Sequence, residues 1–295
     1  MQAETPHQVR RAGAMAVAAT ALFLFPALAF SEPVKKEFRY TVGPGSSLTV
    51  VNLNGPVTVR GVSGRQVLIT ATIHSSKVTV DSSQQGNRVE VWSQFTEQTT
   101  PAERRVEYEI SVPMNTNLTV RAASGPVRIE RLRSDVVLEG DEAPIHVQDV
   151  SNGHVHARTL SGAIVFSNVS GTEVEARSAT GDIRLSRVSA SSVKVTSTKG
   201  NIYYDGEFGL AGNYTLFNHS GNIEVSLPET ASVELSARSQ KGMVQNEVPM
   251  RQKQQAVSPN PARAGSTFVG TSHSGSSSVQ LHTFSGTIRV KKAVE

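Results

Sequence analysis

Apolar and polar residues alternate along most of this chain, and the alternation returns at a nearly fixed interval around a glycine. The copies centre on Gly55, Gly125, Ala143, Gly162, Gly181, Gly200, Gly221, Gly242 and Gly286. From Gly125 to Gly242, successive copies lie 18, 19, 19, 19, 21 and 21 residues apart. A fixed period near 20 residues is typical of repeat proteins, in which each copy forms one structural unit.

Apolar residues occupy the same positions in each copy. Two residues after the central glycine the chain has Val57, Val127, Ile145, Ile164, Ile183, Ile202, Ile223, Val244 and Ile288. Five and seven residues before it, apolar residues recur in most copies, as in Val155 and Ala157. Because side chains of a strand alternate between two faces, each copy predicts a short strand, a turn and a second short strand. We expect the glycine to supply the positive φ of a tight turn.

One strand pair cannot bury its apolar face alone. Copies stacked about 4.8 Å apart would align the apolar positions into one core. The sequence therefore predicts an all-β, single-domain β-solenoid (a single-stranded β-helix) over residues 37–292, with two short strands per coil of about 19–21 residues. An antiparallel sandwich is the alternative, since it also has short alternating strands and glycine-rich turns. A sandwich does not require the same residue types to recur in register.

Two segments interrupt the repeat. Residues 63–117 form a strand-rich insertion, which we expect to add antiparallel strands toward the N-terminal end and to help cap the first coil. Residues 247–275 are rich in Pro, Gln, Ser and basic residues, and this composition predicts a mobile loop. The repeat resumes after residue 275, so the loop lies inside the domain.

The first 29 residues have the pattern of a secretory signal peptide. Arg10 and Arg11 precede the apolar run AMAVAATALFLF, and Ala27-Leu28-Ala29 forms a small-x-small cleavage site. We predict cleavage after Ala29, a short linker at 30–36, and export to the periplasm or cell surface. The run is short for a membrane span, so no transmembrane domain is expected after cleavage. Retention of the segment as an anchor is the alternative.

Cysteine and charge content narrow the choices further. The chain has no cysteine, so its stability has to come from packing and backbone pairing rather than from disulfides. There are 29 Lys and Arg residues against 25 Asp and Glu, a net charge of +4. So small an excess gives no reason to expect nucleic acid as a partner, and no motif indicates a cofactor.

The repeated phrase has a known parallel. The chain resembles the bacterial putative-adhesin family of β-strand repeats, which is related to toastrack-like envelope domains of unknown function. The resemblance is carried by the phrases ASGPVRI, LSGAIVF, ATGDIRL, TKGNIYY, HSGNIEV and FSGTIRV and by the preceding ISVPMNTNLTVR. The resemblance covers about residues 37–292. It implies an exported single-stranded β-helix with an adhesin-like role. That family has no agreed catalytic residues, so the resemblance assigns none here.

The outward-facing positions carry the candidate chemistry. Four residues before the central glycine, Arg121, Arg158 and Arg177 share one column, interrupted by Glu139. Stacked like charges are unfavourable unless something offsets them. We therefore hypothesise that this basic stripe binds an anionic envelope polysaccharide or another envelope protein. The alternative is a solvated face that Glu139 and Glu175 balance.

Other polar positions predict weaker features. His146, His154 and His156 lie on adjacent coils, and a group of imidazoles is able to bind zinc or copper. Alternation places them on the solvent face, with His146 on a different strand of its coil, so we expect surface histidines and no metal site. Glu175 and Lys194 each lie six residues before a central glycine, so we expect a charge pair across neighbouring coils.

Catalytic signatures are missing from the sequence. No outward column gathers two acidic residues on adjacent coils, and there is no Gly-x-Ser-x-Gly, HExxH or phosphate-loop motif. We therefore expect no catalytic residues. The sequence favours an exported, non-catalytic binding or scaffold protein of the bacterial cell envelope. A polysaccharide lyase or hydrolase on the same scaffold, and an envelope-stress sensor module, are the alternatives.

Overall fold

The computed structural model describes residues 33–95, 99–253 and 265–293. The chain divides into residues 1–31 and Glu32–Glu295, and every described strand belongs to the second unit. The predicted signal segment, residues 1–29, therefore lies outside the described part. Strand β1 (Val34–Thr41) begins within the range expected as a linker, residues 30–36, so residues 34–36 are strand rather than linker.

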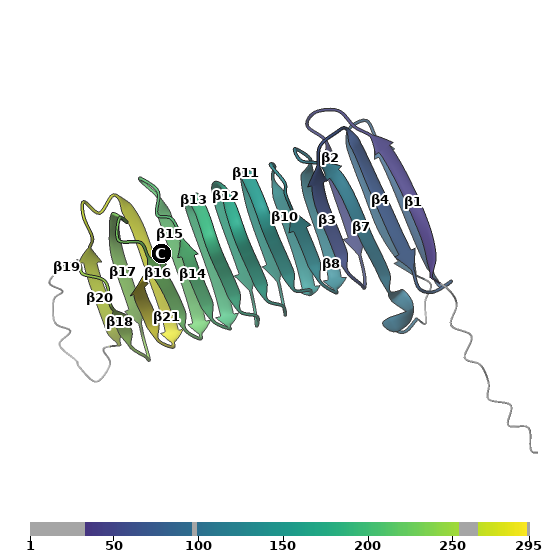
Figure 1. Cartoon of the computed structure of the whole chain (residues 1–295). Helices are drawn as coiled ribbons and strands as arrows, with labels where there is room; N and C mark the ends of the chain where they lie inside the picture. Colours follow the sequence, from purple (N-terminus) through teal and green to yellow (C-terminus); the bar gives the residue numbers. More distant parts are fainter. Residues whose placement is uncertain (1–32, 96–98, 254–264, 294–295) are drawn as a thin grey trace, which may run out of the picture. The chain divides into compact units, whose positions relative to one another are not determined.

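All 22 strands of the described residues join one hydrogen-bonded sheet, which folds back on itself into two layers around a single core (Figure 1). β11 (Ile145–Thr159), β12 (Ile164–Ser178) and β13 (Ile183–Lys199) run through both layers. A short 3₁₀ helix, η1 (Ala102–Arg104), is the only helix in these residues. The continuous sheet confirms the predicted all-β solenoid.

We call the layer that follows each glycine turn layer A, and the other layer B. In layer A, neighbouring strands follow the order β1, β4 (Gln66–Ile73), β7 (Val106–Pro113), β3 (Val57–Val62), β9 (Val127–Glu130), β11, β12, β13, β14 (Ile202–Gly206), β16 (Ile223–Leu227), β22 (Ile288–Lys292) and β18 (Val244–Asn246). In layer B the order is β5 (Val78–Gln85), β6 (Arg88–Phe95), β2 (Ser47–Asn52), β8 (Asn117–Ser124), β10 (Val136–Glu142), β11, β12, β13, β15 (Asn213–Ser220), β21 (Ser277–Ser285), β17 (Val233–Ser239), β20 (Ser266–Thr271) and β19 (Arg251–Gln252).

The apolar column two residues after the glycine forms one continuous stack in layer A. Ile145, Ile164, Ile183, Ile202 and Ile223 are successive register partners in parallel strands, and each is fully buried. The apolar columns of layer B belong to the same buried cluster. Burying one such side chain stabilises a fold by roughly 1.5–3 kcal/mol. The repeat itself therefore supplies much of the free energy that holds the coils together.

Each central coil turns at two corners. The first is at the glycine, and the second lies six residues later, where Arg131, Asp149, Asn168 and Arg187 have φ between 51° and 58°. Asp and Asn adopt this left-handed region more readily than most residues. Backbone pairing continues through the second corner. For this reason β11, β12 and β13 are single strands of 15 to 17 residues, where the sequence predicts two short ones.

Close contact between coils explains the glycine column better than positive φ does. Gly200 and Gly221 have positive φ, but Gly162 and Gly181 do not, contrary to the expectation for these turns. A Cβ on Gly181 would lie 1.8 Å from the carbonyl oxygen of Gly162, and a Cβ on Gly162 would lie 2.5 Å from that of Ala143. Non-bonded atoms do not approach so closely. Steric contact with the preceding coil therefore selects glycine at these two turns.

A column of small polar side chains, three residues before the glycine, is buried against the same turns. Ser178 Oγ donates to the carbonyl of Gly162 at 3.1 Å and accepts the N–H of Gly181 at 2.8 Å. Equivalent bonds to the turn carbonyl of a neighbouring coil are made by Thr159, Asn218, Ser239 and Thr283. A buried carbonyl is costly to leave unpaired, so this ladder stabilises the turns.

The stacking order departs from the chain order at the C-terminal end. β21 and β22 pair with β15 and β16 on one side and with β17 and β18 on the other. The last copy in the sequence therefore lies between the two copies that precede it. This insertion places side chains of β21 directly beside those of β15 and β17.

Antiparallel pairing occurs near both ends of the stack. As predicted for the insertion at 63–117, β4 pairs antiparallel with β1 and β7, and β5 with β6. Part of the expected loop at 247–275 is also strand, since β20 pairs antiparallel with β17 and β19. Residues 254–264 of that range lie outside the described part.

Candidate functional site

The predicted arginine column exists as a row of register partners on layer B, which we call the outward column. In order of neighbouring strands it contains Arg121, Glu139, Arg158, Arg177, Thr196, Phe217, His282 and Arg238. The three arginines occupy the register that the sequence predicts. The far end does not follow chain order, because the insertion of β21 places His282 between Phe217 and Arg238.

Two of the three arginines have a carboxylate partner. Arg121 Nε lies 2.9 Å from Glu139 Oε2, and Arg177 Nε lies 2.8 Å from Glu175 Oε1. Arg158 has Glu139 and Arg177 as register partners and makes no ion pair within the described residues. Excess positive charge on the outward column is therefore greatest at Arg158.

Arg158 and Arg177 form an exception among the strand pairs. In the described strands, theirs is the only register pair that joins two fixed charges of the same sign. Where two fixed charges face one another elsewhere on the sheet, their signs are opposite, as in Glu130 and Arg60, whose Oε2 and Nη2 atoms lie 2.9 Å apart. Like charges opposite one another in a sheet are destabilising. This pair is consequently the strongest candidate for an anion contact.

Arg158 lines two hollows on the surface of layer B. The larger, of about 400 Å³, is also lined by Arg121, Glu139 and Leu160. The smaller, of about 160 Å³, extends toward Arg177. Leu160 is 50% exposed, so the larger hollow offers an apolar surface beside two guanidinium groups.

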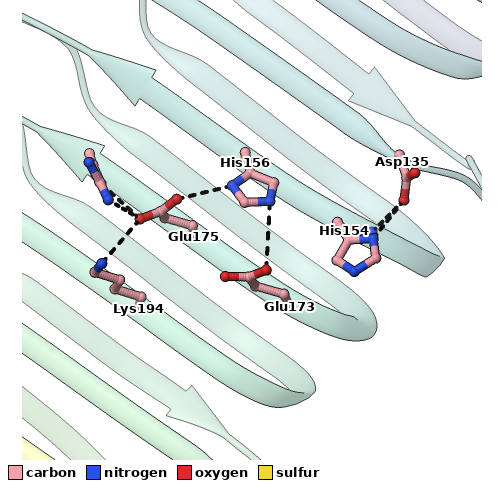
Figure 2. Close-up of polar contacts among 7 residues, drawn as sticks. Asp135, His154, His156, Glu173, Glu175 and Lys194 are labelled. Carbon is pink, nitrogen blue, oxygen red and sulfur yellow. Dashed lines mark hydrogen bonds and ion pairs between the residues drawn. The ribbon is translucent and has the colours of Figure 1, made fainter.

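A charged network lies beside the outward column (Figure 2). His156 Nδ1 lies 3.0 Å from Glu175 Oε2, and His156 Nε2 lies 4.0 Å from Glu173 Oε2. Glu175 Oε1 is also 3.9 Å from Lys194 Nζ, which confirms the predicted cross-coil pair. Burial opposes ionisation of Glu175, but hydrogen bonds from His156 and Arg177 outweigh it and lower the pKa of its carboxyl group. Glu175 therefore remains an anion that neutralises its neighbours.

The three histidines singled out in the sequence do not come together. His154 Nδ1 lies 3.0 Å from Asp135 Oδ1, and the His154 backbone N–H donates to the same oxygen at 2.9 Å (Figure 2). These two hydrogen bonds lower the pKa of Asp135. His146 lies in layer A beside Arg128, away from His156. Within the described ranges, no three His, Cys, Asp or Glu side chains converge as a metal site requires.

Sequence reasoning missed two features of this surface. The hollow beside Leu160 is also lined by Gly140 and Asp141 at the end of β10, whose packing the repeat pattern does not specify. The contact between the rings of Phe217 and His282, at the far end of the outward column, depends on the insertion of β21. Its only sequence signal is that Phe217 and His282 occupy the same position in their copies.

Among the residues described, no helix has the length and apolar character needed to cross a membrane.

The repeat region of the sequence matches a described family. The model of the family described as Toastrack DUF4097 matches residues 46–291. The chain belongs to the Toastrack family. This match confirms the resemblance carried by the recurring glycine phrases. A search of curated proteins finds no match.

Solved structures similar to this Toastrack chain include three bacterial proteins. A "putative adhesin" from Bacteroides fragilis is 11% identical, with 87% of this chain and 97% of that chain covered and a TM-score of 0.49. A "putative adhesin" from Parabacteroides merdae is 12% identical, with 88% and 96% covered and a TM-score of 0.42. A "putative cell adhesion protein" from Clostridium sporogenes is 12% identical, with 89% and 100% covered and a TM-score of 0.27.

Proposed function

We propose that this Toastrack chain is an exported, non-catalytic, adhesin-like protein of the bacterial cell envelope, and that layer B binds an anionic ligand. The pairing of Arg158 with Arg177 carries the proposal. Like charges on neighbouring strands repel, and Arg158, which has Glu139 as its other register partner, makes no ion pair within the described residues. A bound anion relieves that repulsion and adds charge-assisted hydrogen bonds.

The rigidity of the stack supports contact at several points with one ligand. The buried columns fix successive outward side chains about 4.8 Å apart. A polymer with repeated acidic groups can therefore meet Arg121, Arg158 and Arg177 together, with little ordering of the protein on binding. An acidic envelope polysaccharide has this repeating charge. The term adhesin-like is taken from the descriptions of the similar structures, while the support comes from layer B.

The placement of the acidic residues supports binding without catalysis. Most polysaccharide hydrolases use two carboxyl groups that flank one glycosidic bond. In the described strands, no register pair joins two acidic residues, and Glu139, Glu173 and Glu175 each have an arginine or histidine as a register partner. Release of reducing or unsaturated sugar ends from acidic polysaccharides by the purified chain would contradict this part of the proposal.

Export is proposed from the signal-like residues 1–29. Cell fractionation of a bacterial host that expresses the chain with and without residues 1–29 tests it. We expect the full chain in the periplasm or at the cell surface, and the truncated chain in the cytoplasm. An equal distribution of the two chains would contradict export through this segment.

Charge reversal at the arginine pair tests the binding proposal. Arg158→Glu with Arg177→Glu is compared with Arg128→Glu and Arg184→Glu, which make the same change of net charge on layer A. We expect the layer B variant to lose retention on purified envelope fractions by at least about tenfold, while the layer A variant binds as the unaltered chain does. Equal retention of both variants would overturn the proposal.

A further inference from the structure

The outward column changes character at its C-terminal end. There, rings and cations of β15, β21 and the end of β17 form a cluster that we call the aromatic patch, which consists of Phe217, His219, Arg238, Lys241, His282 and Phe284. The rings of Phe217 and His282 meet edge to face at 5.4 Å, and the ring of His219 stacks on that of Phe284 at 5.0 Å. Lys241 Nζ lies 4.7 Å from the centre of the Phe284 ring.

Acidic side chains do not neutralise this patch. β15, β21 and residues 235–241 contain no Asp or Glu. Arg238 and Lys241 make no ion pair with the described residues, and both are exposed. The cations of the patch therefore differ from Arg121 and Arg177, because each of those arginines is neutralised by a glutamate and the patch cations are not. The nearest acidic residue of β17, Glu234, is paired with Lys253, so Arg238 and Lys241 stay free to contact an anionic group.

Uncharged polar residues border the rings. The neighbouring outward positions are occupied by Thr196, Thr215, Ser236, Gln240 and Gln280. Hydroxyl and amide groups both donate and accept hydrogen bonds. The border therefore suits a ligand that carries many hydroxyl groups, rather than one that carries charge alone.

We propose that the aromatic patch is a binding subsite for the sugar rings of an acidic polysaccharide. Phe217 is 38% exposed, and an aromatic face packs well against the apolar C–H side of a sugar ring. The polar border then binds the sugar hydroxyls, and Arg238 and Lys241 bind the acidic groups. The inference rests on the proposed function, because it names the ligand class of the same face.

The arrangement of the rings favours sugars over single-stranded nucleic acid. Bases bind by stacking on several open aromatic faces in succession. Here Phe284 already packs against His219 and Lys241, so open faces are few. A sugar ring needs one apolar face and a polar border, which Phe217 and its neighbours supply.

An unpaired polar atom adds to the argument. His282 Nε2 is buried and has no hydrogen-bond partner among the described residues. Leaving such an atom unpaired costs free energy. The Phe217 ring packs against His282, so this unpaired atom lies next to the ring that we propose as the sugar platform.

The patch and the arginine pair are continuous. From Arg158 through Arg177, Thr196, Phe217 and His282 to Arg238 the outward column crosses five strand spacings, or about 24 Å. A linear polysaccharide along this line reaches the arginines with its acidic groups and the patch with its rings. The patch then gives selectivity for sugars, whereas the arginine pair recognises charge.

The experiment compares three immobilised probes with the full chain: polygalacturonate as an acidic polysaccharide, polyglutamate as a polyanion without sugars, and neutral dextran. We expect Phe217→Ala with His219→Ala to weaken binding to polygalacturonate about tenfold and to leave polyglutamate binding unchanged. Both residues are exposed, so the fold is expected to persist. Phe217→Leu keeps an apolar side chain without the ring and should weaken binding to the same probe. Tyr203→Ala on layer A is the matched control.

Each outcome separates the two proposals. If the patch variants bind polygalacturonate as the unaltered chain does while Arg158→Glu with Arg177→Glu does not, the sugar subsite is overturned and the proposed function stands. If only the patch variants lose binding, the arginine proposal falls and the subsite stands. Equal losses on polygalacturonate and polyglutamate, or competition by single-stranded DNA at equal charge, would also overturn the sugar subsite.

Discussion

Two regions of layer B belong to one sheet and share one core, but their outward side chains differ in chemical character. On the β10, β11 and β12 side, Arg121 and Arg177 each pair with a glutamate, whereas Arg158 makes no ion pair within the described residues. On the side of β15, β21 and the end of β17, rings and cations gather. β15, β21 and residues 235–241 contain no Asp or Glu. The difference teaches that the repeat specifies inward positions only. Outward positions are free to differ from coil to coil, and function on this fold is expected there.

The largest effect is expected from alanine substitutions at the turn glycines, which test whether both regions depend on the same close-packed turns. Gly181→Ala in the first region and Gly286→Ala in the second each place a Cβ about 2 Å from the turn carbonyl of the neighbouring coil, at 1.8 Å and 2.1 Å. We expect each to lower the free energy of unfolding by about 3 kcal/mol. Urea unfolding followed by circular dichroism measures the change.

Gly209→Ala is the control for these variants, because its Cβ would meet nothing nearer than 3.8 Å. A Gly181 variant as stable as the Gly209 variant would show that the coils do not approach as described. A large loss in one region only would show that the two regions unfold separately, as repeat proteins can.

An intermediate effect is expected from the buried polar ladder that lies beneath both surfaces. Ser178 Oγ bonds to Gly162 and Gly181, whereas Ser197 Oγ, at the equivalent position, is buried without a partner among the described residues. We expect Ser178→Ala to cost about 1–2 kcal/mol and Ser197→Ala to cost almost nothing. Thermal and urea unfolding of the two variants side by side measure the difference. Equal costs would rule out the ladder as a source of stability.

The smallest expected effect concerns pH and is confined to the charge-paired region. Because its pKa is lowered by hydrogen bonds from His154, Asp135 stabilises the fold above its ordinary pKa of 3.8, and this contribution is lost as the pH falls below that value. Asp135→Asn should therefore reduce stability at neutral pH, and the difference from the unaltered chain should vanish in acid. Asn213→Ser, at the equivalent position beside the aromatic patch, should show no such pH dependence. A constant difference across the pH range would refute the assignment.

The repeat spacing was sufficient to predict the stacked core and the arginine register. Alternation sends Ile164 and Ile183 inward, and a 19-residue period makes them neighbours. The same period places Arg158 beside Arg177. These are consequences of strand geometry, so they follow from the sequence without knowledge of side-chain packing.

The position of the last copy could not be predicted in this way. Every copy has the same apolar pattern, so the copy around Gly286 is able to pair with any other, and spacing does not reveal that it lies between those around Gly221 and Gly242. The contact of Phe217 with His282 depends on that choice. Ion pairs such as Glu175 with His156 depend in turn on side-chain conformations, which the periodicity leaves undetermined.

Binding as a function of ligand length tests the outward column most directly. Oligogalacturonates of increasing length are titrated calorimetrically into the full chain at fixed salt. We expect affinity to rise with length until the oligomer spans the six rungs from Arg158 to Arg238, about 24 Å, and then to level off. An affinity that is the same for short and long oligomers, or no binding at any length, would contradict a continuous binding line on layer B.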